Sequence, residues 1–349
     1  MIDSLNVAKQ LGEPCIIHVK TKKGKGYLPA EQNSGKYHGI AKRQKSADKG
    51  DTYSEITGKY LAELARADSK ICAVTAAMKY ATGLQHFATE HRQRFFDVGI
   101  AEEHAVTFGG GLASQGMLPV FCIFSTFLQR CYDQIIHDLA IQNLHMVFAI
   151  DRAGMVGEDG ETHQGLFDVS MLSSIPGTAI FSPATAAELK SSLYKALYDH
   201  KGIAAVRYPK GVASNSEGET ADYDIKFCKN GGKALIVTYG RISSNAFFAA
   251  EQLNADVLQL VKVYPIPDDA VKIAYNYNKI AFFEEGIRSG GIGEKFSLKL
   301  LGTGWSGKYK LSAVGGEFVK YCETEKQIAA YDLDIDGMIK ATGDLIEQT

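Results

Sequence analysis

Apolar runs alternate with amphipathic stretches over the middle of the chain, from Thr52 to about Gly211. Short apolar runs predict buried strands, and apolar residues three or four apart predict helices. Strands are expected at 71–75, 95–100, 118–124, 146–150, 179–181 and 204–207, and helices at 53–67, 126–142 and 185–198. This alternation predicts an α/β fold with a mainly parallel sheet and helices on both faces.

A second, smaller α/β series follows a polar, turn-rich linker at Ser214–Asp224. Strands are expected at 234–238, 257–260 and 280–283, and helices at 245–253 and 268–275. A glycine-rich stretch, Gly286–Gly293, then leads into another helix. We therefore expect one domain at 46–213 and a smaller one at 225–349.

The first 45 residues have a different pattern. An amphipathic helix begins near Ile2 with no capping residue, an apolar run at Cys15–Val19 predicts a strand, and a basic, glycine-rich turn follows at Lys20–Tyr27. One helix, one strand and a loop cannot bury a core, so residues 1–45 are interpreted as the end of another domain plus a linker. The turn could cradle a phosphate or could be an ordinary solvated turn.

Composition narrows the class of protein. The chain has 349 residues, 45% of them apolar, and a formal net charge of −2. This charge gives no reason to expect a nucleic acid or an anionic membrane as partner. The sequence has no apolar run of membrane-spanning length, and its six cysteines form no C-x-x-C pair. We expect a cytoplasmic protein without disulfides.

The stretch Asp97–Gly116 is the first candidate for chemistry. A short apolar strand turns directly into a helix that is opened by Glu102 and Glu103. Glu102 is therefore expected at the carboxyl end of a strand, where α/β proteins bind ligands. The alternative is that both acids only complement the helix dipole. The triple glycine Gly109–Gly111 favours close packing of this helix.

Two further segments carry candidate residues. Phe127 and Arg130 lie three apart on a predicted helix, so they could stack a heterocycle and hold an anion. Alternatively, Phe127 is core and Arg130 pairs with an aspartate. The loop Asp151–Gly165 combines four glycines with His163, a candidate for proton transfer, and lacks the spacing of a calcium loop.

A last segment, Arg207–Gly211, ends a predicted strand with two cations around a proline. Such a segment suits an anionic substrate, and it would equally suit a charged domain boundary.

These segments together resemble the 1-deoxy-D-xylulose-5-phosphate synthases, a transketolase-like family of thiamine diphosphate enzymes. The resemblance covers essentially the whole chain, with the motifs in the family's order. The motifs are TKKGKGY, YHGI, DVGIAEEHAV, STFLQRCYDQ, FAIDRAGMVGEDGETHQG and RYPKG. It implies a transketolase-like pyrimidine-binding domain followed by a transketolase C-terminal domain.

The resemblance implies a role for several residues around the cofactor. Glu102 matches the carboxylate that hydrogen-bonds the aminopyrimidine ring of thiamine diphosphate and favours its imino tautomer. Phe127 matches the aromatic residue that stacks on this ring, and Ile100 and Lys23 are placed beside it as cofactor-binding residues. His38 matches a catalytic histidine that projects from the preceding domain.

Other matches concern the substrates, which the resemblance identifies as pyruvate and D-glyceraldehyde 3-phosphate. His163 is implied as a catalytic acid or base, and Asp159 lies near the sugar hydroxyls. Arg130 and Lys210 match the cations that hold the phosphate, and Phe124 lies in the substrate site. The family also implies a homodimer that uses Mg²⁺.

The sequence departs from the family in three places. Phe124 stands where the family has tyrosine, and Lys210 stands where it has arginine. The G-D-G segment that holds Mg²⁺ and the diphosphate is absent, so no residue of this sequence is expected to bind the metal. Met1 falls within the last helix of the domain that carries that segment. We therefore expect the chain to need a separate N-terminal diphosphate-binding domain, as a truncated product or as one half of a split enzyme, and to be inactive alone.

Two alternatives remain. The chain could be the small subunit of a two-gene transketolase or 2-oxoacid decarboxylase, although such a subunit should lack the TKKGKGY and ETHQG segments. It could also be a remnant that only forms oligomers, because the glycine-rich helix suits close contact across an interface. A dehydrogenase is discounted, since Gly290–Gly293 does not have the G-x-G-x-x-G spacing.

Overall fold

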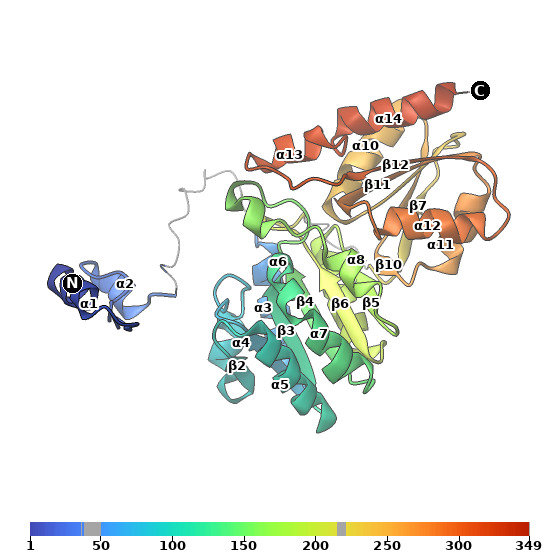
Figure 1. Ribbon diagram of the computed structural model, residues 1–349. Helices are drawn as coiled ribbons and strands as arrows, with labels where there is room; N and C mark the ends of the chain where they lie inside the picture. The colour runs from blue at the N-terminus through green and yellow to red at the C-terminus, as the bar shows by residue number, and fades with distance from the viewer. Residues whose placement is uncertain (36, 38–49, 215–220, 349) are drawn as a thin grey trace. The chain divides into compact units, whose positions relative to one another are not determined.

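The computed structural model describes residues 1–35, 37, 50–214 and 221–348. Its contacts divide the chain into two compact units, Met1–Asp48 and Lys49–Thr349. Figure 1 shows the element labels used here.

The described residues of the first unit, 1–35 and 37, form two short helices. Helix α1 (Ile2–Leu11) begins without a side-chain cap and ends at Gly12, which has a left-handed φ of 64°. Helix α2 (Leu28–Gln32) follows the basic turn, and Glu31 of this helix forms an ion pair with Lys22. The predicted strand at Cys15–Val19 is wrong, because these five residues are exposed and adopt no strand. A lone extended segment leaves its backbone groups without the pairing that makes a strand.

The second unit contains a seven-stranded sheet in the order β10-β5-β6-β4-β3-β1-β2. All neighbouring strands are parallel except β10 and β5, which are antiparallel. The strands are β1 (Ile71–Thr75), β2 (Phe95–Asp97), β3 (Leu118–Phe124), β4 (Met146–Asp151), β5 (Ala179–Phe181), β6 (Ile203–Arg207) and β10 (Lys262–Tyr264). The mainly parallel α/β sheet predicted from the apolar pattern is confirmed.

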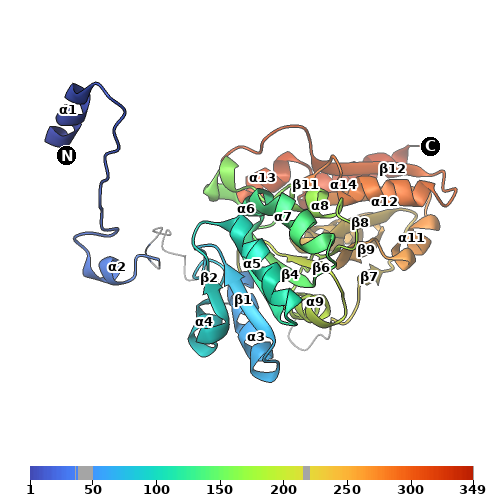
Figure 2. The ribbon, with the colours of Figure 1, turned by 60° about the horizontal axis from the view of Figure 1, so that its bottom comes forward.

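Alternate residues of the central strands enter two different hydrophobic clusters. Phe121 and Phe148 belong to one cluster, and their neighbours Val120 and Val147 belong to the other. Both faces of the sheet are therefore buried, as a parallel sheet requires. The first face carries α5 (Glu102–Ser114), α6 (Ser125–Leu128) and α8 (Asp168–Leu172), and the second carries α3 (Tyr53–Ala67), α4 (Gln85–Glu90) and α9 (Ala186–Tyr198). Figure 2 shows the same layers from another side.

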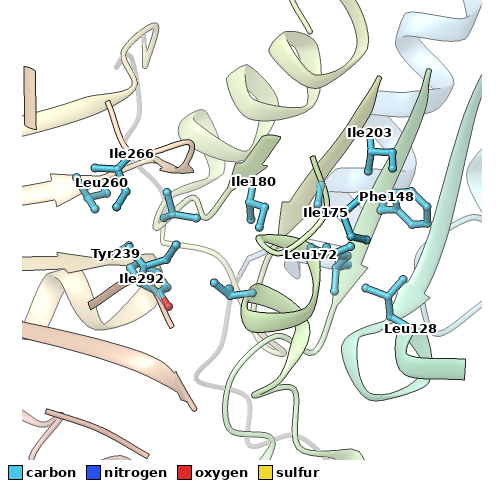
Figure 3. Close-up of a cluster of buried hydrophobic side chains, with 14 of the residues drawn as sticks. Leu128, Phe148, Leu172, Ile175, Ile180, Ile203, Tyr239, Leu260, Ile266 and Ile292 are labelled. Carbon is cyan, nitrogen blue, oxygen red and sulfur yellow. The ribbon is translucent and has the colours of Figure 1, made fainter. Parts of the chain in front are cut away.

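A five-stranded sheet in the order β12-β11-β8-β9-β7 forms a second α/β subdomain together with the helices that follow its strands. The first sheet with its helices and the second sheet with its helices are called the first and the second layer system. Its strands are β7 (Ile225–Cys228), β8 (Leu235–Tyr239), β9 (Asp256–Leu260), β11 (Lys279–Ile287) and β12 (Lys308–Val314). Its helices are α10 (Ser243–Leu253), α11 (Asp268–Tyr275), α12 (Ile292–Leu301), α13 (Thr324–Ala330) and α14 (Ile335–Glu347). The first cluster continues from one sheet to the other, and Figure 3 shows Phe148 and Ile180 of the first sheet together with Tyr239 and Leu260 of the second.

The predicted helix at 126–142 is wrong as a single element. Helix α6 is followed by a 3₁₀ turn at Gln129–Cys131, a short helix α7 (Tyr132–Gln134) and a π-helical segment at Ile135–Ala140. Cys131 leaves helical geometry, with φ −109° and ψ 20°. Changes of helical type of this kind are frequent at functional sites. Further 3₁₀ turns lie at Arg92–Arg94, Gly157–Asp159, Glu161–His163 and Gly240–Ile242.

Candidate functional site

Glu102 is the first residue of α5 and lies just after the edge strand β2. The turn between them is fixed by Asp97, whose Oδ1 accepts the N–H groups of Ala77 and Gly99 at 2.8 and 3.1 Å. Glu102 is only 2% exposed. Its Oε1 accepts a hydrogen bond of 2.6 Å from Nη1 of Arg130, whose side chain is 45% exposed. The buried carboxylate is therefore compensated by a cation that reaches solvent.

Aromatic rings extend this pair into a cluster. The guanidinium of Arg130 lies 4.8 Å from the ring centre of Phe127. Phe127 stacks on Phe124 with ring centres 5.8 Å apart, and it meets the ring of His163 edge-on at 5.5 Å. Phe127 is thus half-buried between a cation and an imidazole, and Arg130 pairs with a glutamate in place of the aspartate that we considered.

The loop that carries His163 is tied to the same cluster. Thr126 donates its hydroxyl to the carbonyl of Thr162 at 2.9 Å, and the Thr162 hydroxyl shares a 2.9 Å hydrogen bond with Nδ1 of His163. Paired backbone hydrogen bonds of 2.7 and 2.8 Å between Gly154 and Gly165 close the base of the loop. Three segments singled out in the sequence, the start of α5, the 124–130 turn and the 151–165 loop, therefore meet at one edge of the sheet.

The structure adds Arg152, which sequence reasoning passed over. Its guanidinium lies 4.0 Å from the ring centre of Phe124, and Nη1 donates to the carbonyl of Ala81 at 2.7 Å. The neighbouring Asp151 is fully buried, and burial raises the pKa of its carboxyl although Arg152 and Ser54 lower it. Its position directly after the apolar run of β4 was the sequence signal that could have identified Arg152, whereas its left-handed φ of 57° is visible only in the structure.

The remaining predicted residues have different surroundings. Lys210 and Asp159 form an ion pair with an Nζ–Oδ1 distance of 2.6 Å. Ile100 is 80% exposed, which is unusual for an apolar residue two positions before the buried Glu102. Lys23 belongs to the first unit, and His38 lies outside the described residues. The roles of all these residues stay predictions.

The described part of the chain lacks two kinds of feature. Among these residues, no group of three or more His, Cys, Asp or Glu side chains could hold a metal ion. None of their helices combines the length and the apolar character needed to span a bilayer.

Family models match most of the chain. Residues 50–214 match the transketolase pyrimidine-binding domain, and residues 224–334 match the transketolase C-terminal domain. The chain belongs to the transketolase-like family. The resemblance identified from the sequence motifs is thereby confirmed.

Curated relatives of this transketolase-like chain include 1-deoxy-D-xylulose-5-phosphate synthases. That of Clostridium kluyveri is 44% identical over 84% of this chain and 49% of its own length. That of Clostridium acetobutylicum is 40% identical over 96% of this chain and 57% of its own length, and that of Thermotoga petrophila is 42% identical over 94% and 54%. The chain spans about half the length of these relatives.

Solved transketolases share the fold. A chain described as a split gene transketolase in an inactive beta4 tetramer aligns with a TM-score of 0.74 and 24% identity, over 85% of this chain and 99% of that one. The transketolase from Leishmania mexicana aligns with a TM-score of 0.73 and 16% identity, over 87% of this chain and 47% of that one.

Proposed function

We propose that this chain provides the pyrimidine-binding side of the thiamine diphosphate site of a 1-deoxy-D-xylulose-5-phosphate synthase. The observation that carries the proposal is the cluster of Glu102, Arg130, Phe127 and His163 at the carboxyl edge of the first sheet. The relatives named for this activity are 40–44% identical to the chain.

The chemistry of these side chains fits an aminopyrimidine. Glu102 offers a carboxylate acceptor that is shielded from water, where its hydrogen bonds are strengthened. Phe127 offers a ring to stack against, and the exposed Ile100 offers apolar surface beside the start of α5. Lys23 is proposed as a further cofactor contact, and His38 as a second catalytic histidine. When bound, thiamine diphosphate supplies the carbon nucleophile and the electron sink needed to decarboxylate a 2-oxo acid.

The proposal gives three of the candidate side chains a defined role. With the cofactor bound, the carboxyl group of Glu102 would hold a proton at a nitrogen of the aminopyrimidine ring. His163 exchanges a proton with the reacting substrate, and its hydrogen bond to Thr162 fixes the orientation of its ring. Asp159 accepts hydrogen bonds from sugar hydroxyls.

The substrates proposed are pyruvate and D-glyceraldehyde 3-phosphate. Arg130 and Lys210 are proposed to bind the phosphate, with Phe124 as a wall of the same site. Both cations are paired with acids in this structure, so phosphate would compete with Glu102 for Arg130 and with Asp159 for Lys210. A phosphate can form charge-assisted hydrogen bonds with each of these cations, which favours the exchange.

The diphosphate and Mg²⁺ are proposed to bind to a diphosphate-binding domain equivalent to the half of the relatives that this chain does not span. In this proposal the chain acts only together with that domain. We also propose a homodimer, in which the exposed face of α5 contacts a second copy. Gly111 on this face has no atom within 4 Å of the position that a Cβ would take, so a close approach is open there.

The test is complementation. The N-terminal half of the Thermotoga petrophila relative is mixed with this chain, and CO₂ release from pyruvate is measured with glyceraldehyde 3-phosphate, Mg²⁺ and thiamine diphosphate. The proposal predicts turnover that requires both polypeptides and the cofactor. A folded mixture that binds thiamine diphosphate and never turns over pyruvate would overturn it and favour a remnant that only forms oligomers.

One observation favours a second candidate. The chain aligns over 99% of a split gene transketolase, which suits a small subunit of a two-gene transketolase or 2-oxoacid decarboxylase. The donor substrate separates the candidates: turnover of a ketose phosphate in place of pyruvate would indicate a transketolase, and pyruvate decarboxylation without use of the aldehyde would indicate a decarboxylase.

A further inference from the structure

The loop that carries Asp159 and His163 is held by two side chains of the second layer system. Glu285, near the end of β11, accepts the N–H of Met155 on Oε1 at 2.7 Å. Gln327, in α13, accepts the N–H of Gly157 on Oε1 at 2.9 Å. These side chains are 5% and 1% exposed, so water does not compete for either bond.

Glu285 and Gln327, the two anchors of the loop, are themselves held by further hydrogen bonds. Arg241 forms an ion pair with the carboxylate of Glu285 and also donates to the carbonyl of Met155 at 2.6 Å. Gln327 donates its Nε2 to the carbonyl of Lys320 at 2.8 Å. Each anchor therefore has little freedom to follow the loop if the loop shifts.

Glycines let these anchors approach the loop. A Cβ on Gly154 would lie 2.5 Å from the carboxyl carbon of Glu285, and a Cβ on Gly157 would collide with Thr324 at the start of α13. Gly154 and Gly157 also have φ values of +84° and +58°. Gly154 and Gly157 thus have a specific function, since they bring the backbone of the loop against the second layer system.

The anchored amides lie just before and at the start of the first of the two 3₁₀ turns that carry the functional side chains. Gly157 begins the turn Gly157–Asp159, and the next turn, Glu161–His163, follows after Gly160. Backbone hydrogen bonds of 3.2 and 3.1 Å link Gly160 to Gly157 and His163 to Gly160. A shift of Gly157 is therefore passed along the backbone to His163.

We infer that Gln327 and Glu285 are positioning residues that set the place of Asp159 and His163 relative to Glu102. The inference rests on the proposed function for what the loop does, and the geometry of the anchoring is independent of it. Neither residue touches the Glu102 cluster. A misplacement of about 1 Å in a catalytic group can reduce the rate by about 10²-fold.

Amide hydrogen exchange tests the anchoring without cofactor or turnover. Gln327→Met keeps the volume and removes both hydrogen bonds, Gln327→Glu keeps the acceptor for Gly157, and Gln259→Met is the matched control. Gln259 is equally buried in the same layer system, but it donates to Glu188 and does not contact the loop. We expect the amide exchange rate at residues 157–163 to rise by about 10-fold or more in Gln327→Met. The rise should be smaller in Gln327→Glu, and the rate should stay at the wild-type value in Gln259→Met.

Unchanged exchange of the loop in Gln327→Met would overturn the inference, and so would an equal rise in Gln259→Met. Because this readout needs no activity, it separates failure of the anchoring from failure of the proposed function. In the complemented protein, Gln327→Met should lower kcat by about 10- to 100-fold with little change in the KM for pyruvate. If kcat falls in both Gln327→Met and Gln259→Met, in proportion to the fraction of folded protein, the role of Gln327 is purely structural. This result would contradict the inference.

Discussion

Glu102 and Glu284 occupy similar places in the two layer systems, yet their surroundings differ in the way that separates a candidate site from a structural support. Glu284 lies in the carboxyl half of β11 and faces the start of α12, and Glu102 is the first residue of α5, shortly after the end of β2. Glu284 accepts the N–H groups of Ile292 and Gly293 at 2.9 and 3.2 Å and the hydroxyl of Tyr239 at 3.0 Å. It is completely buried, and burial raises the pKa of its carboxyl to about 7.

Glu102 instead pairs with Arg130, which lies partly in solvent. A ligand can displace or share this guanidinium, whereas the partners of Glu284 belong to the core. The Gly290–Gly293 stretch, discounted as a nucleotide motif, lets α12 approach Glu284 closely, and a Cβ on Gly291 would collide with its carboxylate. An acid at the carboxyl edge of a sheet therefore does not by itself indicate a ligand-binding site. The solvent exposure of its partner is what distinguishes Glu102 from Glu284.

The largest expected effect is on activity and concerns Glu102. In the complemented protein, Glu102→Gln should lower the rate of pyruvate turnover by about 10²–10⁴-fold, because the amide cannot exchange the proton with the cofactor ring. Glu103→Gln is the matched control, since Glu103 is the next residue of α5 and is exposed. Steady-state CO₂ release measures both. An equal loss of CO₂ release in Glu102→Gln and Glu103→Gln would contradict a specific role for Glu102.

The next effect is on stability and concerns the buried pair beside Glu284. Arg207 donates Nε to Asp168 at 2.8 Å, and its guanidinium lies 5.6 Å from the ring centre of Tyr239. Asp168→Asn should lower the free energy of unfolding by about 3–5 kcal/mol, because it leaves a buried guanidinium without its partner. Urea unfolding at pH 7 measures the change. Asp269→Asn, which breaks an exposed pair with Lys272, should have no measurable effect.

A smaller effect depends on pH. The folded-state pKa of Glu284 lies above the ordinary glutamate value of 4.5, so the folded protein binds more protons than the unfolded chain between about pH 4.5 and 7. The stability from this proton is present below pH 4.5 and is lost as the pH rises to about 7. Glu284→Gln should therefore gain stability relative to the wild type as the pH rises, on the order of 3 kcal/mol between pH 4.5 and 8.

Urea unfolding of the wild type and of Glu284→Gln at a series of pH values measures this difference. A difference that does not change with pH would show that the carboxyl does not titrate in this range. The activity of the complemented Glu284→Gln protein should stay within a few-fold of the wild type, in contrast to Glu102→Gln.

The smallest effect concerns the phosphate. Lys210→Arg should lower the KM for glyceraldehyde 3-phosphate by about 2- to 5-fold, because a guanidinium binds phosphate through two hydrogen bonds where an ammonium acts as a point charge. Lys201→Arg, at an exposed position after α9, serves as control. An unchanged or higher KM in Lys210→Arg would argue against a phosphate contact at this position.

The sequence predicted the buried parts of the fold best. Strands 71–75, 118–124 and 179–181 have the predicted bounds, because a continuous apolar run that is buried on both faces leaves little choice of position. The strand at 15–19 was predicted from the same kind of run and failed, since a strand also needs a neighbour, which a local pattern does not supply. The helix at 126–142 failed because apolar spacing does not separate α, 3₁₀ and π hydrogen bonding.

The sequence predicted which residues belong to the candidate site better than it predicted the contacts between them. Motif order identified Glu102, Phe127 and His163, and the structure brings them together. The Glu102–Arg130 pair joins residues 28 positions apart, so it depends on how β2 and β3 lie in the sheet. The contacts of Gln327 with the 151–165 loop join residues 170 positions apart and have no local signal in the sequence.

The central claim is that the carboxyl group of Glu102 controls a proton on the cofactor. The direct measurement is the rate at which the thiazolium C2 proton of bound thiamine diphosphate exchanges with deuterium, compared in the complemented wild type and in Glu102→Gln. The account predicts an exchange rate that is at least about 10²-fold slower in the variant at equal cofactor occupancy. Equal rates in the two proteins would contradict it.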